Sequence, residues 1–440
     1  MTILIKVAQL LLSLSILVLI HEFGHFIAAK IFKTRVEKFY LFFDPWFSLF
    51  KFKKGETEYG IGWLPLGGYV KISGMIDESM DKEQMKQPPQ PWEFRSKPAW
   101  QRLIIMVGGV FMNVVLAIAI YIVMLAVWGE QYLPNNEVKY GITVDSLAQS
   151  IGLQNGDKII SLDNKPVEDF NKIPAKIILD NPKTIQVERN GVITQVNIPD
   201  GFVGKLIKSE KADFIMPRSP FVAAQFSKGS LGEKGGIRQG DVLVSINQIP
   251  VPYFDMFSAE LSKHKNEKVE VGVLRGKDTV SIPVQLDSTA KLGIYSNPYL
   301  SLTTKTHHYN VLEAIPAGFK KTFKGISSYW KQLKLLVSPK TEAYKSVGGF
   351  IAIGKIFPSM WNWEAFWSLT AFLSIVLAIM NILPIPALDG GHIMFLLYEV
   401  ISGRKPSDKF MERAQVVGMI ILFALLIFAN GNDIWKLFKH

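Results

Sequence analysis

An H-E-x-x-H box, His21-Glu22-Phe23-Gly24-His25, lies inside a hydrophobic segment of this chain. Residues 7–20, which precede the box, are all uncharged, and the first charge after it is Lys30. Helical residues four apart share a face, so His21 and His25 can present their imidazoles to one metal ion. Glu22 lies about 100° round the helix, close enough to act on a water at that metal. Ionisable groups at membrane depth are costly, which disfavours a chance occurrence of the box.

Composition narrows the metal chemistry that this box can support. The chain has 440 residues, 48% of them hydrophobic, and contains no cysteine. A zinc site must therefore use histidines and carboxylates. The formal net charge is +11, but the basic residues flank hydrophobic runs as membrane anchors do and form no stripe for nucleic acid. We therefore expect the lipid bilayer as a partner and no nucleic acid.

Four segments are long enough to cross a bilayer, which requires about 20 apolar residues. They are expected at residues 7–29, 103–129, 365–388 and 414–432. The first is interpreted as a retained span, because no small-residue cleavage site follows it and cleavage would remove the box. An even number of spans places both termini on the same side of the membrane.

Flanking charges set the expected orientation. Basic residues cluster after the first span, before the second, and between the third and fourth. The positive-inside rule then places these loops in the cytoplasm, and the termini and the large region between the second and third spans outside. With a rise of about 1.5 Å per residue, His21 lies roughly 21 Å in from Val7. The box is thus expected nearer the cytoplasmic face.

The region between the second and third spans has a soluble composition and a weak internal repeat. Residues 151–167 align without gaps to residues 235–251, and each copy has a Gly-Asp turn, an alternating strand and a Pro turn. A second strand with a basic turn follows each copy. Two small β-rich domains are therefore expected, at residues 130–210 and 211–300.

Two further segments bear on how a membrane-embedded site would work. Residues 55–74 are glycine-rich and strand-like, and they form either a hairpin that reaches toward the box or an ordinary cytoplasmic hairpin. A strand here could pair with an unwound substrate, and Gly67 and Gly68 are candidate substrate-binding positions. Residues 319–337 resemble an interfacial amphipathic helix, with a soluble helix packed on the second β-rich domain as the alternative.

A catalytic zinc usually has three protein ligands and one open position, so the two histidines need a third partner. The segment NILPIPALDGGH, residues 381–392, offers Asp389 directly after two prolines that interrupt a regular helix. Asp389 could instead serve only to cap the helix that begins at Gly390. Because the H-E-x-x-H box still needs a carboxylate as its third ligand, we favour metal binding by Asp389. We expect His392 to be structural or to support a ligand.

The remaining polar candidates concern the reaction itself. Glu22 would act as general base toward water and then as general acid toward the leaving amine. Asn381 could hold the substrate backbone or an oxyanion through its amide. Asn113, in GGVFMN, is a weaker candidate of that kind, and a hydrogen bond between helices is the favoured alternative. Gly24 is expected to allow close helix packing.

These motifs resemble, in order along the chain, the signature regions of the site-2 protease family of intramembrane zinc metalloproteases: HEFGH, GGVFMN and NILPIPALDGGH. The chain looks most like the bacterial RseP-type members with tandem PDZ domains, and the resemblance covers essentially its whole length. It implies His21, His25 and Asp389 as ligands of one Zn²⁺, Glu22 as catalytic base, and Asn381 in substrate handling. It also implies a polytopic α-helical membrane protein with four transmembrane helices and two PDZ-like domains between the second and third.

The resemblance further implies regulated intramembrane proteolysis in the bacterial inner membrane, with the PDZ-like domains on the periplasmic side. Its substrates would be single-span membrane proteins, such as signal-peptide remnants or anti-sigma factors trimmed by an upstream site-1 protease that need not stay bound. One departure is Phe350, in SVGGFIAIG, where many relatives have a proline.

Two other functions agree less well with the sequence. A PDZ membrane adaptor or chaperone that holds clients without cutting them needs no intact set of zinc ligands. A transporter would have discontinuous helices in both halves of the chain, whereas only the third span is interrupted. We therefore expect a zinc metalloendopeptidase.

Overall fold

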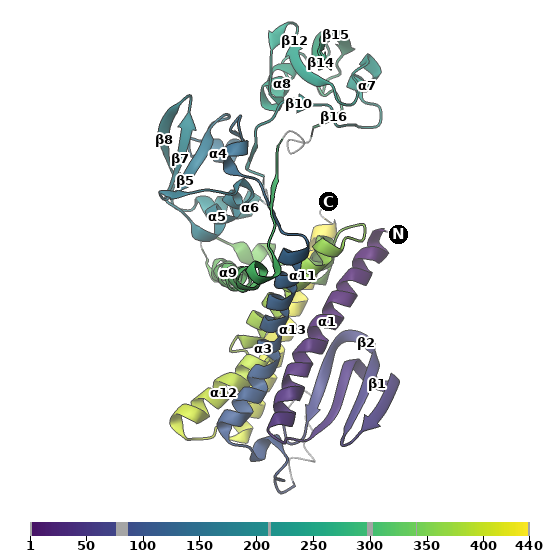
Figure 1. Cartoon of the computed structure of the whole chain (residues 1–440), viewed down its shortest axis with the longest axis vertical. Helices are drawn as coiled ribbons and strands as arrows, with labels where there is room; N and C mark the ends of the chain where they lie inside the picture. Colours follow the sequence, from purple (N-terminus) through teal and green to yellow (C-terminus); the bar gives the residue numbers. More distant parts are fainter. Residues whose placement is uncertain (1, 76–86, 210–212, 297–301, 340, 439–440) are drawn as a thin grey trace. The chain divides into compact units, whose positions relative to one another are not determined.

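The computed structural model describes residues 2–75, 87–209, 213–296, 302–339 and 341–438 (Figure 1). The chain divides into two units that interrupt each other in sequence. One unit, which contains the long hydrophobic helices, comprises Met1–Gly129, His308–Lys334 and Tyr344–His440. The other is rich in β-strands and comprises Glu130–His307 and Leu335–Ala343.

Four helices among the described residues are long and apolar enough to cross a membrane. They are α1 (Thr2–Ile31), α3 (Ala99–Val127), α11 (Trp363–Ile382) and α13 (Asp408–Phe438). The four expected spans are thus confirmed by length and composition. The third ends at Ile382 instead of at residue 388, because prolines follow, and the chain resumes as α12 (Asp389–Ser402).

The break between α11 and α12 is tightly packed by glycines. A Cβ on Gly390 would overlap the Leu383 carbonyl, and one on Gly391 would lie 2.8 Å from the Ile385 oxygen. Gly418 of α13 packs on the same segment, where a Cβ would lie 2.6 Å from the Ala387 nitrogen. The non-helical backbone therefore packs closely on α12 and α13 at these glycines, a partial cover of the kind that irregular backbone at membrane depth needs.

Strands β1 (Val36–Lys54) and β2 (Thr57–Ile72) form an antiparallel sheet beside α1 (Figure 1). Both strands bend, and the register puts residues 36–41 between 57–61 on one side and 68–72 on the other. Residues 48–54 pair with 57–62 only, so 48–54 and 68–72 are the two outer segments. The strand expected within residues 55–74 is confirmed as β2, but the hairpin is formed with β1 and not within that segment, because both halves of β2 pair with residues of β1.

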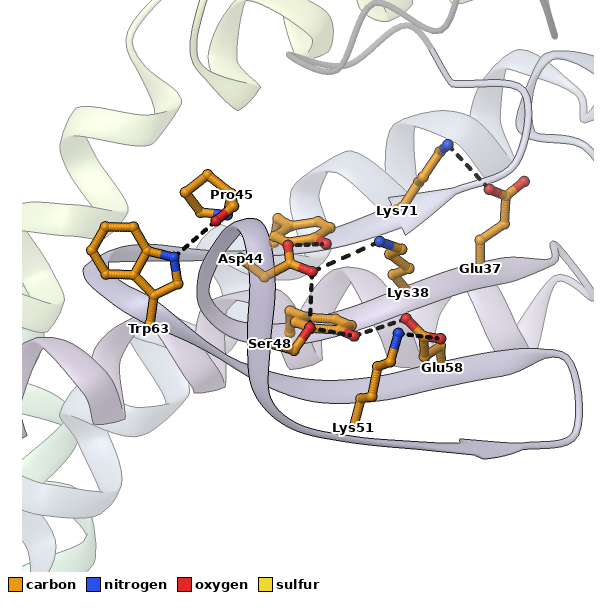
Figure 2. A network of polar contacts seen from close by, with 11 residues as sticks. Glu37, Lys38, Asp44, Pro45, Ser48, Lys51, Glu58, Trp63 and Lys71 are labelled. Carbon is orange, nitrogen blue, oxygen red and sulfur yellow. Dashed lines mark hydrogen bonds and ion pairs between the residues drawn. The ribbon is translucent and has the colours of Figure 1, made fainter.

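A polar network ties the bend of β1 to β2 (Figure 2). Asp44 accepts hydrogen bonds from the Tyr69 hydroxyl (2.8 Å) and the Ser48 hydroxyl (3.2 Å). Trp63 Nε1 donates to the Pro45 carbonyl at 2.8 Å. Burial and the Asp44 carboxylate raise the pKa of Tyr69, so its hydroxyl remains a donor at neutral pH. The bend is therefore held by hydrogen bonds that do not depend on the membrane helices.

The two copies of the repeat fold into sheets of matching strand order. The first sheet contains, in spatial order, β6 (Lys165–Pro166), β5 (Lys158–Leu162), β7 (Thr184–Arg189) and β8 (Val192–Asn197). In the second, β13 (Ile249–Pro250), β12 (Val242–Ile246), β14 (Lys268–Arg275) and β15 (Asp278–Gln285) pair in the same sequence. The two sheets of matching strand order agree with the prediction of two small β-rich domains.

An ion pair with a buried carboxylate recurs in both copies. The carboxylates of Asp157 and Asp241 each accept two hydrogen bonds, of 2.7–2.9 Å, from Arg189 and Arg275 respectively. The Arg275 hydrogen bonds hold the pKa of Asp241 below its ordinary value. The repeated Gly-Asp turn thus supplies the acceptor that anchors the basic turn after the next strand, which explains why both features recur together.

The first β-rich domain extends beyond residue 210, where the sequence placed its end. Strand β9 (Ile215–Pro217) pairs with β4 (Ile142–Val144), and Phe214 belongs to the same hydrophobic core. The core of the second domain begins at Phe221. Local composition does not reveal a strand pairing between distant segments. The domain boundary predicted from the sequence was therefore too early in the chain.

Helix α9 (Val311–Val337) contains the expected amphipathic segment and begins earlier than predicted. Its residues Ile326 and Tyr329 pack against a cluster formed by α3 and α11. Gly318 lies so close to Ile122 of α3 that a Cβ would lie 2.9 Å from the Ile122 nitrogen. The alternative, packing of this helix on the second β-rich domain, is therefore wrong.

Candidate active site

Two helices from opposite ends of the chain bring three donor side chains together. His21 and His25 lie on α1, and Asp389 is the first residue of α12. Asp389 Oδ2 lies 3.1 Å from His21 Nε2 and 3.3 Å from His25 Nε2, and the two Nε2 atoms are 3.3 Å apart. Both histidines are buried. The break after α11 is what turns Asp389 toward α1.

The geometry of these three atoms fits one zinc ion. Bonds of about 2.0–2.1 Å in a tetrahedral site put neighbouring ligand atoms roughly 3.3 Å apart, close to the separations between Nε2 and Oδ2 here. Asp389 Oδ2 is buried and accepts no hydrogen bond from the described residues, and a cation would satisfy it. Within the described part of the chain, no other three His, Cys, Asp or Glu side chains are grouped in this way.

Glycines make room for the histidines where α1 crosses α3. A Cβ on Gly109 would overlap His25 Nε2 and lie 2.7 Å from His21 Cε1. A Cβ on Gly108 would lie 2.6 Å from the Gly24 oxygen, and one on Gly24 would overlap the Gly108 carbonyl. Close packing at Gly24, expected from its place in the box, is confirmed.

Each histidine also has a partner at its other ring nitrogen. His25 Nδ1 donates to the Ile105 carbonyl at 2.8 Å, and His21 Nδ1 lies 3.1 Å from Asn113 Nδ2. The Ser374 hydroxyl of α11 donates to the Asn113 backbone carbonyl at 2.7 Å. Asn113 therefore lies at a junction of helices, as the favoured interpretation held, but its amide points to a histidine.

Glu22 and Asn381 lie at the same site. The Asn381 amide nitrogen is 3.3 Å from His21 Nε2, which places it beside the three donor atoms. Val70, in the outer segment of the β-sheet, lies with its backbone N–H next to the Glu22 carboxylate. The sheet thus reaches the box, as one of the two expectations for residues 55–74 held. Local sequence patterns contain no signal for the contact between Val70 and Glu22.

The two candidate glycines of the hairpin belong to β2. Gly68 pairs with Leu41 and packs against α1, where a Cβ would lie 2.8 Å from Val18 Cγ1. Gly67 faces the Phe43 ring, 2.9 Å from where its Cβ would be. Gly68 lets the outer segment of the sheet approach α1 closely, and Gly67 leaves room for the Phe43 ring. Contact of either glycine with a substrate remains a prediction.

Two other positions singled out from the sequence lie outside the group of donors. His392 is on α12 and lines a small cavity with Pro386, in keeping with a structural role. Phe350 begins α10 (Phe350–Ile356), and its backbone N–H donates to Asn430 Oδ1 at 3.2 Å. A proline, which lacks this N–H, could not make the hydrogen bond. The backbone N–H that Phe350 has, and that proline lacks, is thus used in a hydrogen bond to Asn430.

Comparison with known proteins gives a consistent assignment. The sequence profile of Peptidase family M50 matches residues 9–425. The chain is 27% identical to the "Regulator of sigma E protease" of Haemophilus influenzae, over 99% of this chain and 100% of that protein. It is 28% identical to a Fusobacterium nucleatum protein named "Putative zinc metalloprotease", over the full length of both chains. A Neisseria meningitidis protein with that description is 26% identical over 97% of this chain and 98% of its own length.

A profile match over nearly the whole chain decides the family, and the His-His-Asp geometry agrees with the metal that these relatives are named for. The apolar helices agree with a multi-pass membrane protein. The chain therefore belongs to Peptidase family M50, the site-2 protease family, and is a zinc metalloendopeptidase.

Proposed function

We propose that His21, His25 and Asp389 hold the zinc ion and that Glu22 is the catalytic base, in a protease that cuts single-span membrane proteins within the membrane. The observation that carries this proposal is the 3.1–3.3 Å spacing of three donor atoms on helices of hydrophobic composition. Ionisable groups on such helices are costly and are kept for function, and a zinc peptidase built there would act on peptide bonds in or near the bilayer.

The side chains divide the work in this proposal. When bound, zinc supplies an activated water and polarises the scissile carbonyl. Glu22 takes the proton of the attacking water and returns it to the leaving amine. The backbone N–H of Val70, next to the Glu22 carboxylate, is placed to orient it. Asn381, 3.3 Å from His21 Nε2, is placed to donate its amide to the substrate backbone or the oxyanion.

A transmembrane substrate must be unwound before water can reach its peptide bonds, because its helical carbonyls are already hydrogen-bonded. The outer segment 68–72 of the β-sheet can do this by strand addition. Within the sheet, this segment pairs with residues 36–41 along one edge only. Its residue Val70 lies beside Glu22. We therefore propose that the substrate pairs with residues 68–72, next to Gly67 and Gly68, and that this sheet is cytoplasmic.

The absence of native cysteine allows a direct test of this docking strand. In a Glu22→Gln background, Lys71→Cys on the outer segment 68–72 is expected to form a disulfide with a cysteine at the substrate's cleavage region. Lys51→Cys, on the opposite outer segment 48–54, is the matched control and should not. Cross-linking to Lys51→Cys alone would contradict the proposal. Both cysteines should react with a membrane-impermeant thiol reagent only from the cytoplasmic side.

The biological role that we infer is regulated intramembrane proteolysis in the inner membrane. Its supports are the relative named for regulation of sigma E and the tandem β-rich domains of matching strand order. In this proposal the β-rich domains are PDZ domains outside the membrane that screen out substrates with untrimmed ectodomains. The substrates are single-span proteins such as trimmed anti-sigma factors or signal-peptide remnants.

Removal of the metal tests the proposed function. The purified protein, given a single-span reporter substrate, should lose cleavage after chelation and regain it when zinc is added. Asp389→Ala should bind zinc at least tenfold more weakly, because one of three ligands is lost. Full cleavage without zinc, or undiminished zinc in Asp389→Ala, would refute the assignment. A substrate that keeps a folded ectodomain should be cut more slowly than its trimmed version.

A further inference from the structure

Asn113 has an environment that its bond to α11 does not explain. Its side chain is fully buried, and its amide has His21 as its only hydrogen-bond partner within the described part of the chain. The amide oxygen, Oδ1, is buried and has no partner there. The link to α11 is made by the Asn113 backbone carbonyl, which accepts from Ser374. Any side chain at position 113 would keep that link.

The chemistry of a histidine ligand says what His21 needs from this neighbour. His21 Nε2 faces Asp389 Oδ2 and His25 Nε2, so Nε2 is the nitrogen that a metal ion would take. A neutral imidazole then carries its proton on Nδ1, and such an N–H requires an acceptor. His25 satisfies this need with the Ile105 carbonyl at 2.8 Å.

Rotating the Asn113 amide by 180° exchanges Oδ1 and Nδ2 without moving the rest of the side chain. Oδ1 then lies at hydrogen-bond distance from His21 Nδ1 and accepts its proton. We propose that Asn113 is a positioning residue for the metal site: its amide oxygen holds His21 in the tautomer and ring orientation that present Nε2 to zinc. This inference rests on the ligand set proposed above.

The test compares zinc affinity among full-length variants, measured by competition with a chelator. Asn113→Leu removes the acceptor at similar size and should weaken zinc binding about 10–100-fold, the usual effect of losing such a partner. Asn113→Asp supplies a stronger acceptor and should bind zinc at least as tightly as the wild type. Ser374→Ala breaks the bond between α3 and α11 without touching His21, and should leave the affinity within about twofold.

A spectroscopic signature separates positioning from general packing. With Co²⁺ in place of zinc, Asn113→Leu should shift the visible absorption bands, and Ser374→Ala should not. The proposal is overturned if Asn113→Leu binds zinc as the wild type does, or if Ser374→Ala weakens binding equally. If Asn113→Leu does not fold, Asn113→Asp decides, and weaker zinc binding in it overturns the proposal. His21→Ala is the separate check: undiminished zinc there would mean that the ligand set itself is wrong.

Discussion

Replacing Glu22 by glutamine is expected to abolish detectable cleavage while leaving zinc in place. Glutamine keeps the size of the side chain and can still contact the Val70 backbone, but it cannot take a proton from water. Loss of a general base typically costs 10²–10⁴-fold in rate. Glu22 is not one of the three grouped donors, so metal content should match the wild type. The measurement pairs turnover of a single-span reporter with zinc analysis of the same sample.

A matched control for this variant is Glu364→Gln, which removes an exposed carboxylate near the start of α11. It should cut at the wild-type rate. Wild-type turnover in Glu22→Gln would exclude Glu22 as the base. A loss of zinc together with activity would instead assign Glu22 to metal binding.

The second large effect is expected at Gly109, where one methyl group should disable the site. The Cβ of Gly109→Ala would overlap His25 Nε2 and crowd His21 Cε1. Both imidazoles would have to rotate, because a retreat of α3 from α1 would give up the close packing of Gly24 on Gly108. Shifts of this size at metal ligands cost about 10–100-fold in affinity at a single ligand. With two ligands displaced, we expect at least a 100-fold loss of zinc affinity and no cleavage.

The control for Gly109→Ala is Gly431→Ala. Gly431 is also a helical glycine, but the place of its Cβ is open. An alanine there should slightly favour the helix, by up to about 1 kcal/mol, and leave zinc and turnover unchanged. Normal zinc binding in Gly109→Ala would mean that α1 and α3 separate more easily than their packing suggests.

The donor set of the site was accessible from sequence because each member has a local signature. The i, i+4 spacing of His21 and His25 matches the helical period, and the two prolines before Asp389 predict a break in a helix. What sequence could not provide was anything set by long-range pairing. The contact of Val70 with Glu22 and the pairing of β9 with β4 depend on register between distant segments.

Asn113 shows the same limit within a single residue. In the sequence it is one polar side chain in an apolar helix, for which a bond between helices is the common role. Only the packing of α3 on α1 shows that the amide faces His21 Nδ1, while the backbone carbonyl makes the bond to α11. The residue type indicated that the side chain needs a partner, and the fold determined which one.

The arrangement of the donor residues along the chain has a consequence for biosynthesis. With the proposed ligands, α1 carries two donors, and α12, which is synthesised much later, carries the third. A nascent chain therefore has an incomplete donor set until Asp389 has been inserted. On this assignment the site cannot hold zinc with all three ligands before α12 packs against α1.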